Sequence, residues 1–477
     1  RMAAAGETVA SAPGKVMIAG GYVVLERPNP AIVAAVSARV YTQVLDIADG
    51  EEFPCNSVVV HSPQMEETRV YTLKMEGESL SISQREGLKR NGYIESTVLN
   101  TFAFIAEQKQ LQTFNPIKIS INGDKSFYAI DGDYDKVPRF PKIARQADGA
   151  AEHAAEVQKT GLGSSAALVT SLVAALLQHF HVVELPGPNS SPEDPSFQGQ
   201  ETLHKLAQYC HCIAQGKIGS GFDVAAAVFG SIQYVRFSPS VLDVKKDEEN
   251  VINRKSLSQL ITKSDGFDHN VVAWELPAGF FLAVGDVRGG GSSTPSMVSA
   301  INKWRVSTEE AQNHWKRIIS MNARVGKALS DVTALSKSNK ETYSKAISLY
   351  VKMRQGAEEQ TGEECRECLD AIQKFAEEMA EVRAAMRQMG EMAGVPLEPP
   401  PQTNLLDMTT KIPHVLAAGV PGAGGFDAVF AIAVGEEGMA KVSEAWSSWS
   451  QEGSGQVRLM SLSCENQGTV RHPGLPS

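Results

Sequence analysis

A short glycine-rich segment at residues 159–167 reads Lys-Thr-Gly-Leu-Gly-Ser-Ser-Ala-Ala. Its two glycines permit a tight turn, and the apolar residues after it predict a helix that begins near Ser164. The start of such a helix directs free N–H groups and the positive end of its dipole at the turn, which suits a phosphate group. Ser164 and Ser165 could cap this helix, bind a phosphate oxygen or reach a magnesium ion. A plain glycine turn with a serine cap is the alternative.

Two further segments combine glycine with polar residues. Residues 11–22 read Ser-Ala-Pro-Gly-Lys-Val-Met-Ile-Ala-Gly-Gly-Tyr, which puts Lys15 at the entrance of an apolar strand. An ordinary lysine at a sheet edge is the alternative there. Residues 419–427 read Gly-Val-Pro-Gly-Ala-Gly-Gly-Phe-Asp and precede a predicted strand. Their glycines could bring backbone close to a ligand, or could only build a turn.

Known nucleotide motifs and metal motifs do not account for these segments. The chain lacks the P-loop string G-x-x-x-x-G-K-[ST], and the 159–167 turn is not the dinucleotide string G-x-G-x-x-G. Cys365 and Cys368 form a C-x-x-C in a charged helical stretch without a second pair, and Cys-His-Cys at 210–212 lies in another helical run. We interpret both as packing rather than as metal or redox sites.

The composition is that of a folded protein, and 477 residues favour two domains. With 45 Lys and Arg against 55 Asp and Glu, the net charge of −10 argues against nucleic acid and anionic membrane as partners. No apolar run approaches the length of a transmembrane span. Six irregularly spaced cysteines do not predict a disulfide framework. Without a signal peptide or a terminal peroxisomal tripeptide, we expect a cytoplasmic location, with the peroxisome as the alternative.

Periodicity places these segments among alternating strands and helices. Helical spacing predicts helices in both halves, and alternation of apolar and polar residues predicts the strands. Residues 131–158 and 185–200 are polar and rich in Gly, Pro or Ser, and predict loops. Predicted strands are 36–48, 58–61, 69–73, 117–121, 231–237, 271–276, 280–287, 425–434 and 457–462. Predicted helices are 93–108, 164–180, 201–215, 304–329, 342–355 and 364–392.

Taken together and in this order, the three segments resemble the signature motifs of the GHMP kinases, a family named for galactokinase, homoserine kinase, mevalonate kinase and phosphomevalonate kinase. Within the family, residues 214–224 (Ala-Gln-Gly-Lys-Ile-Gly-Ser-Gly-Phe-Asp-Val), 289–298 and 386–390 are similar to the eukaryotic phosphomevalonate kinase branch. Gly21-Tyr22 stands where many members carry Glu-His, which fits that branch and argues against galactokinase.

The resemblance implies a two-domain α+β fold, with a mixed N-terminal domain at 1–240 and a helix-rich C-terminal domain at 241–477. It implies Lys15 and Asp223 at the reacting centre, and a helix cap is the alternative for Asp223. For ATP binding it implies Lys159, Thr160, Gly161, Leu162, Gly163, Ser164, Ser165 and Ala166, with Ser165 also as a magnesium ligand. For the acceptor it implies Tyr22, Ser220, Ser292, Ser293, Thr294, Gly424 and Gly425.

The reaction implied is transfer of the γ-phosphate of ATP to (R)-5-phosphomevalonate, which gives (R)-5-diphosphomevalonate and ADP with the help of Mg²⁺. A phosphate monoester has a second pKa near 6, so this acceptor is already ionised at pH 7. We therefore expect Asp223 to orient Lys15 and the metal rather than to remove a proton. Two polyanions must meet, which makes Lys15 the central residue and Lys159 and Lys217 secondary candidates.

Two other functions remain open at this point. One is a sister enzyme of the same fold, either mevalonate kinase or the ATP-dependent diphosphomevalonate decarboxylase. The other is a non-catalytic member of the family that binds a ligand as a sensor. The presence of Lys15, Ser165 and Asp223 together argues against the second possibility. Rates of ADP release with mevalonate, phosphomevalonate and diphosphomevalonate distinguish the sister enzymes from one another.

Overall fold

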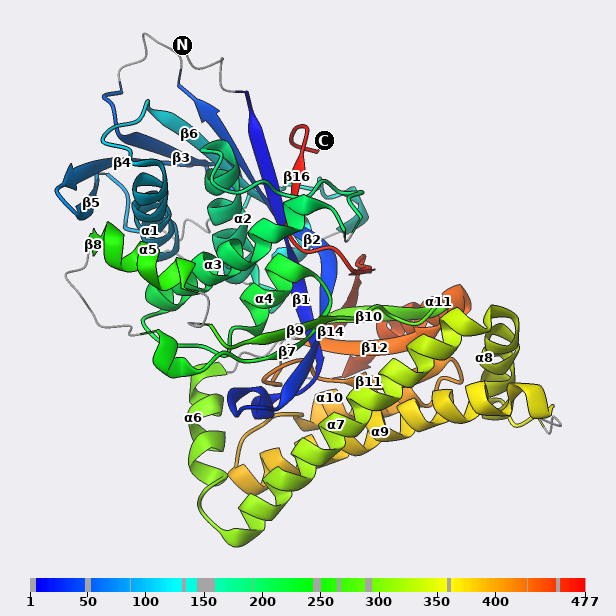
Figure 1. Ribbon diagram of the computed structural model, residues 1–477. Helices are drawn as coiled ribbons and strands as arrows, with labels where there is room; N and C mark the ends of the chain where they lie inside the picture. Colours follow the sequence, from blue (N-terminus) through cyan, green and yellow to red (C-terminus); the bar gives the residue numbers. More distant parts are fainter. Residues whose placement is uncertain are drawn as a thin grey trace.

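The described residues form two β-sheets, each with helices packed against it (Figure 1). This is the α+β class expected from the sequence. The structure is a computed structural model that describes residues 6–47, 53–85, 87–130, 134–143, 159–191, 193–242, 250–263, 267–287, 294–357, 362–426, 428–451 and 455–476.

The first sheet is built on the long antiparallel pair β1 (Thr8–Ala19) and β2 (Pro30–Asp46). Among the described residues eleven strands join it, in the order β16-β1-β2-β6-β3-β4-β5-β8, with β7 and β15 on β2 and β9 on β7. The other strands are β3 (Ser57–Ser62), β4 (Glu67–Glu76), β5 (Ser79–Gln84), β6 (Ile117–Gly123), β7 (Ile232–Val235), β8 (Val251–Asn253), β9 (Asn270–Ala273), β15 (Cys464–Glu465) and β16 (Val470–His472).

In the described part of the chain, five α-helices accompany this sheet: α1 (Gly92–Lys109), α2 (Ser164–His179), α3 (Gln200–Gln215), α4 (Phe222–Phe229) and α5 (Arg254–Thr262). Helix α2 packs on β1 and β2 and also contacts α1, α3 and α4. It is therefore buried on nearly every side, which explains its run of Ala, Leu and Val instead of an amphipathic stripe.

The second sheet has the strand order β11-β12-β10-β14-β13 in the described part of the chain. Along β12 (Ala428–Val434), Phe430 and Ile432 pack into the main core, while Val429 and Ala431 pack into a second cluster. Both faces of the strand are covered, so its sequence is apolar throughout. The other strands are β10 (Phe280–Val287), β11 (Val415–Gly419), β13 (Ser450–Gln451) and β14 (Gly455–Met460).

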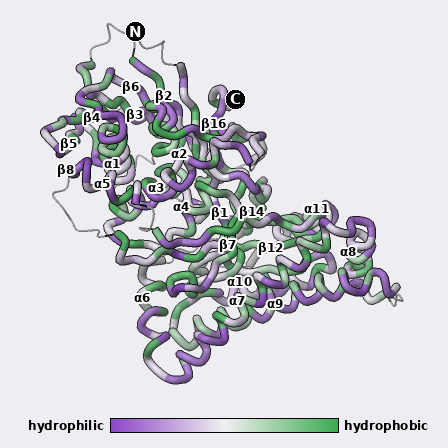
Figure 2. The backbone as a smooth tube through the Cα atoms, viewed as in Figure 1, coloured by the Kyte–Doolittle hydropathy of each residue, from purple (hydrophilic) through white to green (hydrophobic). Residues whose placement is uncertain are grey.

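Long helices cover this second sheet. Helices α7 (Glu309–Ser338) and α9 (Glu363–Ala393) pack along each other (Figure 1), and hydrophilic and hydrophobic residues alternate along them (Figure 2). Their apolar faces turn to the core and their charged faces to solvent. The remaining helices are α6 (Thr294–Trp304), α8 (Lys340–Arg354), α10 (Pro400–Thr410) and α11 (Gly435–Ser448). None of the described helices combines the length and apolar character that crossing a bilayer requires.

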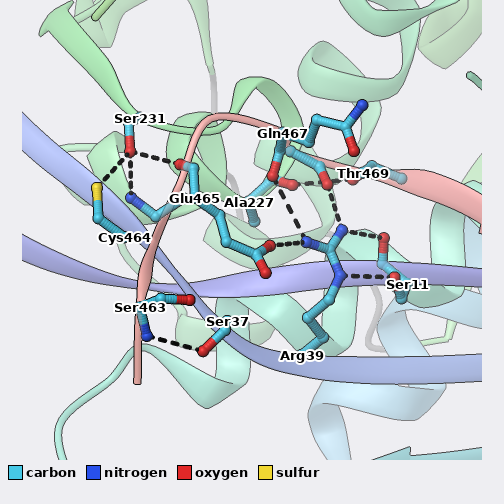
Figure 3. A network of polar contacts seen from close by, with 12 residues as sticks. Ser11, Ser37, Arg39, Ala227, Ser231, Ser463, Cys464, Glu465, Gln467 and Thr469 are labelled. Carbon is cyan, nitrogen blue, oxygen red and sulfur yellow. Dashed lines mark hydrogen bonds and ion pairs between the residues drawn. The ribbon is translucent and has the colours of Figure 1, made fainter. Parts of the chain in front are cut away.

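The last strands return to the first sheet, where β16 pairs with β1 and β15 pairs with β2. Figure 3 shows the buried Arg39 at their junction, where its guanidinium donates to Ser11 Oγ at 2.8 Å, to Glu465 Oε2 at 2.7 Å and to the carbonyl of Gly468. Thr469 Oγ1 donates to the Ala227 carbonyl at 2.9 Å. The segment that leads into β16 is thus fixed to the C-terminal end of α4.

Most predicted elements are confirmed, with differences at particular places. The helix predicted from residue 304 is wrong at its start, because α6 ends at Trp304 and α7 begins at Glu309 after a Thr308 cap. Of the predicted loop 131–158, residues 131–133 and 144–158 lie outside the described residues. The division near residue 240 stays a prediction, although β8, β9, β15 and β16 follow it in the sequence and belong to the first sheet.

Candidate active site

The glycine turn lies directly against β1. The backbone N–H of Lys15 donates to the carbonyl of Leu162 at 2.9 Å. On the other side, Thr160 Oγ1 donates to the Ser126 carbonyl at 2.5 Å. Gly161 and Gly163 have φ values of 72° and 76°, and Gly163 is the N-cap residue of α2. The turn therefore leads into the helix as expected, with the first free N–H groups of α2 at its end.

Gly14 is what allows the turn to come so close to the strand. A Cβ at this position would lie 2.9 Å from Phe127 Cε1 and 3.0 Å from the Leu162 carbonyl oxygen. The pairing of β1 with β2 also shifts register between Pro13 and Gly14. Proline has no N–H to give to the ladder, so a register break here is easily accommodated. The Pro-Gly pair before Lys15 thus has a structural task of its own.

The amine of Lys15 lies over the turn. Its Nζ donates to the carbonyl of Gly161 at 3.0 Å and lies 5.6 Å from the centre of the Phe222 ring. Burial lowers the pKa of this amine below its ordinary value, and the negative charge of Asp223 acts against that effect. Lys15 and Asp223, which are far apart in sequence, are therefore electrostatic neighbours, and the carboxylate helps to keep the amine protonated.

Asp223 stands in the first turn of α4. Its Oδ1 accepts the backbone N–H of Val224 at 3.0 Å, so it also contacts the start of the helix. The preceding Gly221 has a φ of 86° and no room for a side chain, because a Cβ would lie 2.7 Å from Tyr234 Oη and 2.7 Å from Gln208 Oε1. The Ser-Gly-Phe-Asp sequence therefore turns sharply and brings the carboxylate to the helix start, where the dipole favours negative charge.

Ser165 contacts a histidine that the sequence interpretation had assigned to packing. Its Oγ lies 3.3 Å from Nε2 of the buried His211, and Gln215 Nε2 lies 3.1 Å from the same ring nitrogen. Both contacts meet the same ring nitrogen, whose role as donor or acceptor depends on the tautomer of His211. In the tautomer in which Ser165 donates to this nitrogen, the lone pairs of Ser165 Oγ remain for a phosphate-bound cation. Both His211 and Gln215 lie on α3.

The third glycine segment, at residues 419–427, contacts the end of the segment at residues 11–22. Tyr22 is buried, and its hydroxyl donates to the Ala423 carbonyl at 2.7 Å. The close approach that Gly424 permits is to protein backbone, since a Cβ there would lie 2.3 Å from the Leu397 carbonyl oxygen. Gly425 N–H donates to this same oxygen at 2.8 Å. These glycines therefore build a tight junction, and Gly424 also lines a cavity beside it.

That cavity lies between β1 and the second sheet. Its wall includes the end of β1 with the two glycines that follow it (Met17 to Gly21), the glycine segment at 422–424, and two arginines of α9. Arg383 is held by Glu398 at 2.7 Å and Asp407 at 2.7 Å, whereas Arg387 lies 3.8 Å from Glu398. Arg387 is thus the less tightly paired of the two cations, and the sequence reasoning did not single it out.

The remaining predicted site residues lie on several different elements. Ser220 accepts a hydrogen bond from Tyr234 Oη at 3.2 Å through its carbonyl. Lys159 and Lys217 are exposed, at the start of the glycine turn and just after α3 respectively. Thr294 is the first residue of α6, while Ser292 and Ser293 lie outside the described residues.

The chain is a member of the GHMP kinases. The family model for the GHMP kinase N-terminal domain matches residues 153–231, and the model for the C-terminal domain matches residues 368–451. The first match contains the glycine turn and Asp223, and the second contains Arg383, Arg387 and the third glycine segment.

Within this family the chain is similar to phosphomevalonate kinases. The peroxisomal phosphomevalonate kinase of Arabidopsis thaliana is 37% identical over 92% of each chain, and the enzyme of Gibberella zeae is 32% identical over 96% of this chain and 95% of its own. The fold is shared with phosphomevalonate kinase of Streptococcus pneumoniae in complex with phosphomevalonate and AMPPNP, with a TM-score of 0.58, 15% identity and coverage of 95% and 98%.

Proposed function

We propose that this chain transfers the γ-phosphate of ATP to (R)-5-phosphomevalonate and releases (R)-5-diphosphomevalonate and ADP. The observation that carries the proposal is the joint placement of three groups: the glycine turn at the start of α2, the Lys15 amine over that turn, and Asp223 as the charge next to Lys15. The relatives that span nearly the whole chain are named for this activity, which supports the choice of acceptor.

The turn and the helix start would hold the phosphates of ATP. Residues 159–166 supply the backbone N–H groups at the N-terminus of α2, where an anion is favoured by both hydrogen bonds and the helix dipole. Ser164, Ser165 and Ala166 form the first turn of that helix. The positive φ of Gly161 and Gly163 is needed for this shape, since a side chain there would strain the backbone.

The reaction itself needs little more than position and charge. An oxygen of the acceptor phosphate attacks the γ-phosphorus, a new P–O bond forms, and the bond to the oxygen bridging the β- and γ-phosphates breaks. ADP leaves with that oxygen and its electron pair. The attacking oxygen is already ionised near pH 7, so no proton has to be removed. Lys15 would offset the repulsion between the two polyanions, and Asp223 would keep Lys15 charged and oriented.

Magnesium fits the groups around Ser165. A serine hydroxyl that donates a hydrogen bond to His211 would keep its oxygen lone pairs available, and oxygen is the ligand atom that Mg²⁺ prefers. Ser165 would hold the ion, and Asp223 would help to orient it. When bound, magnesium supplies neutralisation of phosphate charge. His211 would position Ser165 for this task, and Gln215 would in turn hold the His211 ring.

The acceptor would extend from Lys15 toward the cavity at the far end of β1. Gly424 lines this cavity, and Tyr22 hydrogen-bonds to Ala423 in its wall. Further predicted contacts are Gly425, Ser220, Ser292, Ser293 and Thr294. Phosphomevalonate carries a carboxylate at the end opposite its phosphate, and Arg387 in the cavity wall is the cation best placed to receive it. This assignment gives the two ends of the substrate separate positive partners.

The test is an assay of ADP release with phosphomevalonate, mevalonate and diphosphomevalonate as acceptors. We expect rapid, magnesium-dependent turnover with phosphomevalonate alone. Comparable turnover with mevalonate would identify a mevalonate kinase, and phosphate and CO₂ release from diphosphomevalonate would identify the decarboxylase. ATP binding without turnover of any of the three would favour a sensor. We keep the cytoplasm as the proposed location, to be compared with the peroxisome by a fluorescent fusion.

A further inference from the structure

Three side chains with metal-binding chemistry meet at the beginning of α3, away from the phosphate turn. Glu201 and His204 lie three residues apart on one face of this helix, and His269 lies directly before β9. One ligand atom from each residue lies within 4.8 Å of the others. Two imidazoles and one carboxylate are a ligand set found in zinc sites of proteins.

His204 is a buried histidine without a hydrogen-bond partner among the described residues. Its side chain is 0% exposed, and among the described residues neither ring nitrogen has a hydrogen-bond partner. His269 Nδ1 is likewise buried without a partner in the described part of the chain. A buried polar atom without a partner is unfavourable, because it has lost its hydrogen bonds to water.

The distances between these atoms are close to those between the ligand atoms of a bound zinc ion. Zinc binds nitrogen and carboxylate oxygen at about 2.0–2.1 Å, so two ligand atoms at a tetrahedral angle lie about 3.3–3.4 Å apart. His269 Nε2 and Glu201 Oε2 are 3.4 Å apart. The two imidazole rings have centres 4.4 Å apart and are inclined at 62°. Closing the wider pairs, at up to 4.8 Å, requires the ligand atoms to approach each other by up to about 1.4 Å.

The surroundings combine an apolar wall with an open side. Phe229 lies 5.1 Å from the His204 ring centre and 6.3 Å from that of His269. On the other side the Glu201 side chain is 58% exposed and gives access from solvent. The nearby cation Lys205 donates from its Nζ to the Lys263 carbonyl at 3.0 Å. A divalent ion would therefore be shielded on one side and hydrated on the other.

We propose that Glu201, His204 and His269 form a binding site for a zinc-class divalent ion that fixes the start of α3 to β9. The two histidines and one oxygen of Glu201 supply three ligands, and a water molecule completes a tetrahedral site. Nitrogen donors favour zinc over magnesium, which prefers oxygen and octahedral geometry. The site is separate from the phosphate centre, because His211 lies about two turns, or roughly 10 Å, further along α3.

Zinc binding to the purified full-length protein tests this proposal. Calorimetry with ZnCl₂ in excess Mg²⁺, after the protein has been treated with a zinc chelator, should give one equivalent of bound zinc. Glu201→Gln, His204→Gln and His269→Gln should each weaken binding by at least about tenfold, because loss of even a supporting partner costs that much. His61→Gln is the control, since His61 lies on β3 and hydrogen-bonds to Thr68.

The thermal melt and X-ray absorption decide the remaining outcomes. Zinc should raise the Tm of the wild type and of His61→Gln but not that of Glu201→Gln, whose exposed side chain can change without loss of the fold. Absorption spectra should show nitrogen and oxygen ligands. Sulfur ligands would point instead to Cys365 and Cys368, which are buried free thiols, and would overturn the assignment. Absence of stoichiometric binding, or equal binding by Glu201→Gln and His269→Gln, would overturn it as well.

Discussion

The side chain of Lys15 lies against the backbone of Gly163. A Cβ added to this glycine would stand 3.0 Å from Lys15 Cε and 3.2 Å from Lys15 Cγ. The φ of 76° at Gly163 is also unfavourable for a residue with a side chain. The phosphate turn and the lysine over it are therefore one packed unit, and a change at position 163 must disturb both.

Gly163→Val should weaken ATP binding and also reduce kcat, because the β-branched side chain blocks the turn and displaces the lysine. Calorimetry with a non-hydrolysable ATP analogue measures the first effect, and steady-state kinetics the second. Gly161→Val is the matched control, since Gly161 has nearly the same φ of 72°, but among the described residues no atom lies within 4 Å of its added Cβ. Equal effects of both changes would show that backbone strain, not contact with Lys15, is responsible.

Lys15→Met should reduce kcat by about a hundredfold or more, since loss of one preorganised charge-stabilising contact costs on the order of 3 kcal/mol. The substitution removes the amine that we place between donor and acceptor phosphates and keeps most of the apolar side chain. Single-turnover measurements of γ-phosphate transfer are the appropriate test. Near-normal turnover by the variant would show that Lys15 has only a structural role.

The stability of Lys15→Met should equal or slightly exceed that of the wild type at neutral pH. A lysine whose pKa is lowered on folding destabilises the folded state while the amine is protonated. This penalty is present below the folded-state pKa and disappears as the pH rises toward 10.5, the ordinary value. Urea unfolding at pH 7 and pH 10 measures the difference. A large loss of stability in the variant would contradict the pKa direction.

Ser165→Ala should raise the magnesium concentration required for half-maximal rate, because the proposed ligand oxygen is lost. His211→Phe should act in the same direction, by about tenfold, because it removes the partner that orients the hydroxyl. Cys210→Ala is the control on the same helix, since Cys210 is buried and its thiol is not part of this contact. A magnesium requirement unchanged in His211→Phe would show that the contact with Ser165 does not orient it.

The main elements of the fold could be predicted because their signals are local. Helices α2, α3 and α9 and strands β3, β6 and β10 follow from periodicity in single stretches of sequence. Short elements such as β8, β15 and β16 could not be predicted, because two or three residues have no period and are strands only through partners distant in the chain. The boundary at Trp304 failed because the helix pattern continues across the short break before Thr308.

The candidate site could be predicted in part for the same reason. Glycine segments mark the turns by themselves, so Gly161 and Gly163 were identifiable from sequence. His211 was not, because its role depends on which face of α3 meets Ser165, and a histidine among buried residues usually indicates packing. The tight contact of Gly424 with the backbone of Leu397 is likewise a tertiary relation that no local pattern reveals.

Asp223→Asn should reduce the rate at every pH and keep the acidic limb of the pH–rate profile. We attribute that limb to the second ionisation of the acceptor phosphate near pH 6, which the substitution does not touch. The alkaline limb should shift to lower pH. Burial already lowers the pKa of Lys15, and without the negative charge of Asp223 it falls further, so the amine loses its proton earlier. Single-turnover rates from pH 5 to pH 10 measure both limbs.

Two roles of Asp223 give different profiles in this experiment. A general base would place its own carboxyl pKa on the acidic limb, and that limb would vanish in Asp223→Asn. A residue that orients and charges Lys15 leaves the acidic limb in place and moves the alkaline one. We expect the second pattern, because the attacking phosphate oxygen carries no proton near pH 7. Loss of the acidic limb with normal ATP and magnesium affinities, and with an unshifted alkaline limb, would instead make Asp223 the base.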